Sequence, residues 1–504
     1  MKNIKYLFLS AVLIGFTACN EDAYDYNPAP EPMPEFTAGS IDVSKHVAVG
    51  ASFTAGYADG ALFIAGQTNS FPKILNDQFL NANGSGTFTQ PLMNDNIGGL
   101  LFGGAPLLDT EGNNMFPPRL YFNGTGPVRL TVPSTTEATN NVYSSQGPFN
   151  NMGVPGAKSF HITFKGYGAL NPYFGRMASS ATASMLEDAI SQNPTFFTLS
   201  EVGVNDVLAF ATSGGTGVDQ TGNFDPSKYG SNDITDPNVF GAAFTGMVDA
   251  LTANGVKGVV ANVPYITNLP HFTTVPYNPV PLDAATATAL NQGYAVYNGG
   301  LQQALAALTG TGLFTAEEVA KRTINFSAGP GNKLVIIDET LTDLGAINPA
   351  FAEIPKYRQA TSDDLFVLPL SSLIPQGYGT QIPLADQWVL LPSEQLAIKT
   401  ATDAYNVIIA AKAAEKGLAL VDFKGILQEA STTGISDGNF IFTTSLVTGG
   451  LVSLDGIHLT SRGYAVLANK MLAAIDATYG SNFIAAGVKA DPGNYLTNYP
   501  PTLQ

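Results

Sequence analysis

Short apolar stretches alternate with longer amphipathic stretches along most of the chain. Four apolar stretches are rich in β-branched or aromatic residues and bounded by turn residues, as buried parallel strands are; they are 46–49, 196–202, 256–263 and 418–423. Four longer stretches have helical spacing of their apolar residues: 178–192, 283–308, 393–416 and 462–479. Strands that alternate with such helices form right-handed βαβ units. The pattern therefore predicts an α/β fold with a doubly wound, mostly parallel sheet flanked by helices.

Three intervening stretches are too long to be simple connections. They are rich in glycine, proline and small polar residues, and they are 81–150, 209–240 and 311–392. The third also contains a short helical pattern at 315–321 and a strand-like one at 333–338. Loops of this length in a compact domain are usually functional. We interpret them as insertions that cap a site in a domain spanning 44–480, with a C-terminal tail at 481–504.

The N-terminus has the order of a secretory signal. Two lysines precede an apolar run, residues 6–16, and Cys19 follows. The run is too short to span a bilayer, and the bulk of Phe16 disfavours ordinary cleavage after Ala18. The segment resembles a bacterial lipoprotein signal, which implies removal of residues 1–18 and acylation of Cys19. The other interpretation, a buried free cysteine, is disfavoured because nothing just after the run resembles a core.

The segment 19–43 is acidic and proline-rich, as extended, solvated tethers are. Its acidic start resembles the surface-export signals of Bacteroidetes lipoproteins, although a plain soluble spacer explains it equally well. We therefore expect an extracytoplasmic protein held to the bacterial outer membrane by its lipid. Whether it faces the cell surface stays open.

Composition excludes several classes of function. The 504 residues include 23 Lys and Arg against 40 Asp and Glu, for a net charge of −17. No basic surface is available for a phosphate backbone, so nucleic acid is excluded as a partner. The single cysteine excludes internal disulfides and thiolate zinc sites. No histidine pair has metal-ligand spacing and no phosphate-binding loop motif is present, so we expect neither metal nor cofactor.

Three residues near strand ends have the chemistry of acyl transfer. Ser52 follows the first apolar strand, two residues after Gly50, and small neighbours leave a nucleophilic hydroxyl accessible there. Gly156 closes a glycine-rich stretch, and Asn205 comes directly after the second strand. Backbone N–H groups and an amide side chain are the donors that an oxyanion hole requires. Taken alone, a serine after a strand is more often a turn former or a helix cap than a nucleophile.

A histidine that can serve as the base lies just before the last predicted helix. Asp455 and His458 are three residues apart, so the carboxylate can orient the imidazole within one turn. A helix cap and a surface histidine are the simpler alternatives. With four histidines in the chain, coincidence is the weaker explanation. We expect His46 and His161 to be structural, the latter in an apparent strand at 160–164, whereas His271 is a candidate pocket residue.

The segments 50–56, 151–156, 201–206 and 454–464 resemble, in order, the four signature blocks of the SGNH (GDSL-like) hydrolases. The most specific is Asp-Gly-x-His-Leu-Thr with a following Gly-Tyr. The resemblance implies that Ser52 is the nucleophile, that His458 is the general base and that Asp455 is its acidic partner. It also implies three oxyanion donors, which are the N–H groups of Ser52 and Gly156 and the amide of Asn205.

The same resemblance implies a flavodoxin-like three-layer fold and the hydrolysis of carboxylic esters through an acyl-enzyme. The substrate would be a lipid or an acylated carbohydrate. The chain departs from the family at Ala51, where the Gly-Asp-Ser-Leu motif has aspartate, which changes how the nucleophile loop is braced. The alternative is a surface lipoprotein that binds glycan or lipid without turnover, and the complete triad argues against it.

Overall fold

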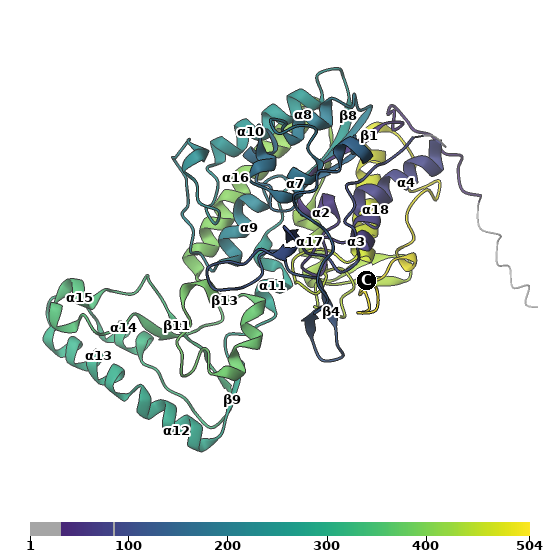
Figure 1. Ribbon diagram of the computed structural model, residues 1–504. Coiled ribbons are helices and arrows are strands. Elements are labelled where there is room, and N and C mark those ends of the chain that lie inside the picture. The colour runs from purple at the N-terminus through teal and green to yellow at the C-terminus, as the bar shows by residue number, and fades with distance from the viewer. Residues whose placement is uncertain (1–31, 84–85) are drawn as a thin grey trace, which may run out of the picture. The chain divides into compact units, whose positions relative to one another are not determined.

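The computed structural model describes residues 32–83 and 86–504, and Figure 1 shows its ribbon. The predicted signal segment and the predicted acylation site at Cys19 lie outside the described residues. By their contacts, residues 36–504 form one unit. Of the helices in the described ranges, none combines the length and apolar character needed to cross a bilayer.

A five-stranded, all-parallel sheet lies at the centre of this unit, which confirms the predicted fold class. Its spatial order is β15-β8-β7-β1-β6, and the strands are β1 (His46–Gly50), β6 (Asn151–Gly153), β7 (Phe196–Leu199), β8 (Lys257–Ala261) and β15 (Ala419–Val421). In the register, Val49 of β1 lies opposite Met152 of β6 and Leu199 of β7. All four predicted strands are present, and β6 is added at one edge.

The sheet separates two hydrophobic cores. Successive strand residues alternate between them: Phe196 and Val259 belong to one core, whereas Phe197 and Val260 belong to the other. This is the period-two alternation of a strand buried on both faces. Burial of both faces explains why the strands are continuous apolar runs in the sequence.

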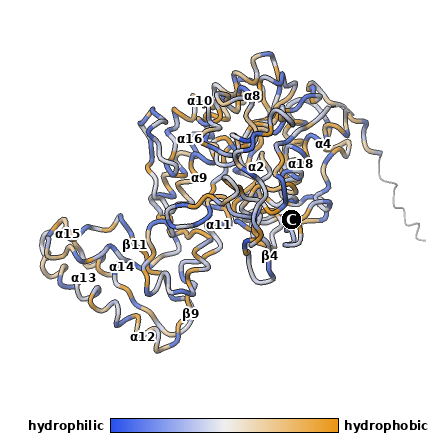
Figure 2. Tube along the Cα trace, in the orientation of Figure 1, coloured by the Kyte–Doolittle hydropathy of each residue, from blue (hydrophilic) through white to orange (hydrophobic). Residues whose placement is uncertain are grey.

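Helices cover both faces of the sheet (Figure 1). Among them, α4 (Phe71–Asn83) and α18 (Ser461–Tyr479) pack in one core, and α8 (Met185–Ile190), α9 (Asn205–Thr212), α10 (Pro237–Leu251) and α16 (Pro392–Lys416) pack in the other. Along such helices, Figure 2 shows hydrophobic and hydrophilic positions in alternation. The start of α18 is fixed by Thr460, whose hydroxyl accepts the N–H of Gly463 at 2.9 Å.

Residues between β8 and α16 form a lobe with hydrophobic clusters of its own. The predicted helix 283–308 was expected to flank the sheet, and this is wrong. It is two helices, α12 (Ala284–Gly293) and α13 (Ala295–Ala307), which pack within the lobe. The predicted short helix and strand of the third insertion are present there as α14 (Ala316–Arg322) and β11 (Val335–Ile337).

A buried ion-pair network stabilises the lobe. Arg358 donates to Asp338 at 2.5 Å and to both oxygens of Asp364 at 2.7 Å. Arg358 is only 4% exposed, and both carboxylates are more than 95% buried. These hydrogen bonds join β12 (Tyr357–Gln359), which carries Arg358, to the end of β11 and to the turn before β13 (Leu365–Phe366).

Three further sequence predictions need correction. The helix predicted at 178–192 is only α8, because Ser184 and Glu187 form a capping box that starts the helix there. The apparent strand at 160–164 is helical: α6 (Ser159–Ile162) begins where the ring of His161 accepts the N–H of Lys158. The packed body also starts earlier than 44, since Ile41 and Val43 are buried in one of the two cores.

The remaining elements are short. The two-stranded antiparallel pairs are β2 (Leu101–Phe102) with β3 (Ala105–Pro106), β4 (Leu120–Phe122) with β5 (Pro127–Arg129), β9 (Val280–Leu282) with β10 (Gly329–Asn332), β11 with β12 (Tyr357–Gln359), β13 (Leu365–Phe366) with β14 (Val389–Leu390), and β16 (Ile435–Asp437) with β17 (Phe440–Phe442). The other α-helices are α2 (Ser52–Ala55), α3 (Ile64–Thr68), α5 (Tyr143–Gln146), α7 (Pro172–Met177), α11 (Pro270–Thr273), α15 (Leu344–Ile347) and α17 (Phe423–Thr432).

Candidate active site

Three adjacent strands deliver three of the candidate site residues to one edge of the sheet. Ser52 starts α2 just after β1, Gly156 follows β6, and Asn205 starts α9 after β7. Because β1 pairs in parallel with both β6 and β7, the carboxyl ends of all three strands meet at the same edge. This edge is where open α/β sheets bind ligands.

The nucleophile turn is packed against backbone on both sides. A Cβ at Gly50 would collide with the hydroxyl of Thr54, and one at Gly153 would collide with the N–H of Ala55. Glycine is therefore required at both positions, because α2 lies directly on the end of β6. Ser52 itself is 8% exposed, so its position is fixed while some access remains.

A buried carboxylate supports this turn from the neighbouring strand. One oxygen of Glu201 accepts the N–H groups of Ala51 at 2.6 Å and Thr54 at 2.8 Å, and the other accepts the Thr54 hydroxyl at 3.1 Å. Burial raises the pKa of Glu201 to about 7, although hydrogen bonds from Ser200, Thr54 and Ala51 oppose the rise. Glu201 was not among the predicted site residues. A carboxylate directly after a buried strand was the available signal.

Asp455 and His458 form the hydrogen-bonded pair that the sequence predicts. The Nδ1 atom of His458 lies 2.9 Å from Oδ2 of Asp455, whose Oδ1 accepts the N–H groups of Ile457 and His458 at 2.9 Å. Burial would raise the pKa of Asp455, but the charge and hydrogen bond of His458 and the two N–H groups outweigh it and hold the pKa below its usual value. The ionised carboxylate therefore fixes the orientation of the imidazole.

The loop after the nucleophile is hydrogen-bonded to the turn that carries this pair. Gly60 donates its N–H to Asp455 at 2.8 Å, and Asp59 accepts the N–H of Leu454 at 3.0 Å. The N–H of Asp59 is in turn bonded to the hydroxyl of Ser453 at 3.0 Å. Three hydrogen bonds thus join segments that are nearly 400 residues apart in the sequence.

The ring of His458 lies against the side chains around Ser52. Its centroid is 4.5 Å from that of Tyr57 and 5.6 Å from that of Phe53, and the N–H of Tyr57 donates to the carbonyl of Ser52 at 2.9 Å. Within residues 32–83 and 86–504, no hydrogen bond joins the hydroxyl of Ser52 to His458. Hydrogen bonds between catalytic groups are often long without substrate. Rotation about the side-chain bond of Ser52 changes the distance between its hydroxyl and the ring of His458.

The oxyanion candidates Gly156 and Asn205 line one cavity of about 640 Å³. The amide of Asn205 donates one N–H to the carbonyl of Ala157 at 2.9 Å, which leaves its second N–H for a ligand. Asp206 accepts the N–H and hydroxyl of Ser159 at 2.9 and 2.6 Å. It therefore ties the Gly156 loop to α9.

The other histidines have different surroundings. His46 is buried, its Nε2 lies 3.3 Å from the hydroxyl of Thr198, and burial lowers its pKa to about 3. Burial lowers the pKa of His161 to about 4, with the charge of Lys158 adding to the effect. The backbone of His271 donates to the carbonyl of Gly456 at 3.0 Å, and its ring lies 3.3 Å from the carbonyl of Asp455. His271 thus supports the turn that carries the pair.

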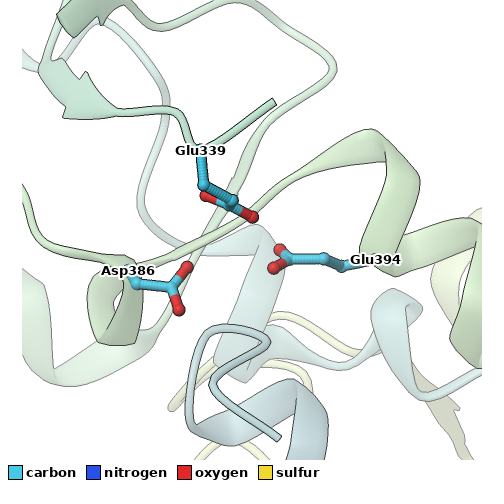
Figure 3. A group of neighbouring side chains, drawn as sticks. All are labelled: Glu339, Asp386 and Glu394. Carbon is cyan, nitrogen blue, oxygen red and sulfur yellow. The ribbon is translucent and has the colours of Figure 1, made fainter. Parts of the chain in front are cut away.

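A group of three carboxylates has the arrangement of metal ligands, and it was not predicted. In Figure 3 the side chains of Glu339, Asp386 and Glu394 point toward one another, and one oxygen from each lies within 4.8 Å of the others. Burial raises the pKa of Asp386 to about 6, with the charge of Glu339 adding to it. Oxygen ligands of this kind suit a hard divalent cation. The three residues are in or next to the lobe, and none belongs to the predicted triad.

Comparison with known proteins identifies no relative. No family model, no curated protein and no solved structure matches the chain. The assignment of chemistry to the site therefore depends on the residues and their geometry.

Proposed function

We propose that the protein is a serine esterase that hydrolyses carboxylic esters through an acyl-enzyme. The observation that carries the proposal is the Asp455–His458 pair, hydrogen-bonded to the loop that follows Ser52. The donors from Gly156 and Asn205 at the same edge of the sheet support it. The sequence blocks that resemble the SGNH hydrolases supply these same residues, and the parallel sheet is compatible with that fold.

In this mechanism, neutral His458 takes the proton of Ser52 as the hydroxyl oxygen attacks the ester carbonyl. Asp455 holds the imidazole by its Nδ1–H, so that Nε2 is the atom that accepts the proton. The negative charge that develops on the carbonyl oxygen is met by the N–H groups of Ser52 and Gly156 and by the amide of Asn205. His458 then returns the proton to the leaving alcohol, and a water molecule releases the acyl group by the same steps.

The first test measures turnover and labelling of the serine. Wild-type protein should hydrolyse p-nitrophenyl butyrate and react with a fluorophosphonate, with the label on the peptide that contains Ser52. The Ser52→Ala variant should lose both while keeping its thermal unfolding transition. Ser180→Ala, which changes an exposed serine, is the matched control. Labelling that persists in Ser52→Ala would move the nucleophile elsewhere.

The alternative function is that of a lipoprotein that binds glycan or lipid on the same scaffold without turnover. It is distinguished by an intact Ser52 that stays unlabelled.

In either case we propose that the acylated Cys19 anchors the chain to the outer membrane. Metabolic labelling with an alkyne fatty acid should mark the wild type, and Cys19→Ala should abolish the label and move the protein to the soluble fraction.

A further inference from the structure

The candidate oxyanion donors Gly156 and Asn205 line a cavity whose walls include neither Ser52 nor His458. In ester hydrolysis the base must return its proton to the leaving alcohol, so the alcohol lies on the histidine side. The acyl group is the other substituent of the carbonyl carbon, and it extends from the oxyanion donors in the opposite direction. Among the cavities near the site, the one lined by Phe53 and Ile457, next to Ser52 and His458, holds only about 60 Å³, and the one lined by Ala55 and Gly153 holds about 10 Å³. The cavity at the oxyanion donors holds about 640 Å³.

The walls of the larger cavity present apolar and aromatic faces. Phe160, Phe164 and Leu170 line it, and the rings of Phe160 and Tyr229 meet edge to face at 5.7 Å. Phe164 is 49% exposed and Leu170 is 69% exposed. Both side chains line the same cavity, so a ligand bound there would cover them.

Apart from the second N–H of Asn205, which is assigned to the oxyanion, the charged and phenolic groups in the walls make hydrogen bonds within the protein. The ammonium of Lys158 donates to the carbonyl of Asp233 at 2.7 Å, and the carboxylate of Asp225 accepts the N–H and hydroxyl of Ser227 at 3.1 and 2.6 Å. The hydroxyl of Tyr229 donates to a backbone carbonyl. A sugar ring would find few free partners there, whereas a hydrocarbon chain requires none.

We propose that this cavity, lined by Phe160, Phe164, Leu170 and Ala209, is the acyl-binding subsite and takes an unbranched fatty acyl group of medium length. The proposal rests on the proposed esterase function and names the substrate class of the same site. Ala209 lies one turn after Asn205 on α9 and lines the same cavity, so a larger side chain at 209 would fill the space next to the oxyanion donors.

The test compares kcat/KM for p-nitrophenyl acetate, butyrate and octanoate. Each buried CH₂ favours the longer chain by about threefold to fourfold, so wild type should prefer octanoate to acetate by at least tenfold. The octanoate-to-acetate ratio should fall at least tenfold in Ala209→Phe and severalfold in Phe164→Ala. Ala404→Phe, on the partly exposed face of α16, should leave the ratio unchanged. A ratio near one in wild type, or one that Ala209→Phe leaves unchanged, overturns the subsite.

A binding measurement separates failure of the subsite from failure of the proposed function. Decanoate should bind Ser52→Ala protein in calorimetry, and the double variant with Ala209→Phe should bind it at least tenfold more weakly. If no ester is hydrolysed and Ser52 is not labelled, yet decanoate binds and Ala209→Phe weakens it, the esterase function falls and the apolar subsite stands. If esters are hydrolysed but decanoate does not bind, the subsite falls and the esterase function stands.

Discussion

Glu201 accepts the backbone N–H of Ala51, the residue before the candidate nucleophile, at 2.6 Å. A carboxylate at the end of β7 thus supports the nucleophile turn at the end of β1. In the Gly-Asp-Ser-Leu motif, which this segment resembles, an aspartate stands at the position of Ala51. Because the same oxygen also accepts the N–H of Thr54, it holds both ends of the first turn of α2.

We expect Glu201→Ala to lower kcat by about 10- to 100-fold with little change in KM, since small displacements of a nucleophile have effects of this size. Glu201→Gln keeps an oxygen that can accept both N–H groups and should retain activity within about threefold. Steady-state kinetics and the rate of fluorophosphonate labelling check the expectation. Equal losses in both variants would show that the charge matters and not the hydrogen bonds.

Asp455→Asn should lower kcat by a factor on the order of 10³–10⁴, because the amide no longer fixes the tautomer of His458 that accepts the proton of Ser52. The pKa of Asp455 is held below its usual value, so its contribution to stability is present above the unfolded pKa and is lost as the pH falls through the folded one. The mechanism requires neutral His458, so the activity of wild type should decline on acidification before this contribution to stability is lost. Parallel pH profiles of activity and circular dichroism test this order.

Asp59 gives a stability prediction of the opposite sign. Burial raises its pKa to about 7 from 3.8, although the N–H of Leu454 opposes the rise. The contribution of Asp59 to stability is fully present below the pKa that this residue has in the unfolded chain, and it is lost as the pH rises through about 7. Asp59→Asn keeps the acceptor for Leu454 and suits the positive φ of 53°. Between pH 5 and pH 8 the wild type should lose roughly 2–3 kcal/mol relative to this variant, since one pKa unit corresponds to about 1.4 kcal/mol.

Urea unfolding at the two pH values measures this difference. Asp109→Asn, which changes an exposed carboxylate in a surface turn, is the control and should track the wild type. A difference between wild type and Asp59→Asn that is constant with pH would show that the carboxyl group at 59 does not titrate in this range.

Arg358→Met should destabilise the lobe by about 3–5 kcal/mol, because it leaves the carboxylates of Asp338 and Asp364 buried without their cation. Thermal and urea unfolding measure the loss. Lys165→Met removes an exposed pair with Glu187 and should unfold close to wild type, as surface pairs contribute little. Restoration of stability by Asp338→Asn with Asp364→Asn in the Arg358→Met background would identify the unpaired charges as the cause.

The sheet was predictable from the sequence because its strands are buried on both faces. That burial requires apolar runs such as Val47–Val49 and Phe196–Leu199, which stand out in a chain this rich in glycine and small polar residues. Strand β6 has only three residues and begins with polar Asn151, so no run marks it. Helix α10 has a start signal in the sequence, Asp236 before Pro237 with apolar residues at helical spacing. This signal falls at the end of the predicted insertion 209–240, so the helix was not predicted.

The candidate site was predictable where chemistry depends on sequence-local spacing and not where it depends on tertiary contacts. Asp455 and His458 are three residues apart, so their pairing follows from one turn. The contact of Asp59 with the same turn joins residues 395 apart, and no local pattern encodes it. The break of the predicted helix 283–308 at Tyr294 likewise follows from packing, because α12 and α13 pack mainly in different clusters.

The hydrogen bonds between the loop at Asp59 and Gly60 and the turn at Asp455 also have a consequence for biosynthesis. The hydroxyl of the candidate site is in the first part of the chain to leave the ribosome, and the imidazole is in the last part. Under the proposed mechanism, a chain that ends before residue 458 has the serine without its base, so it should hydrolyse no ester.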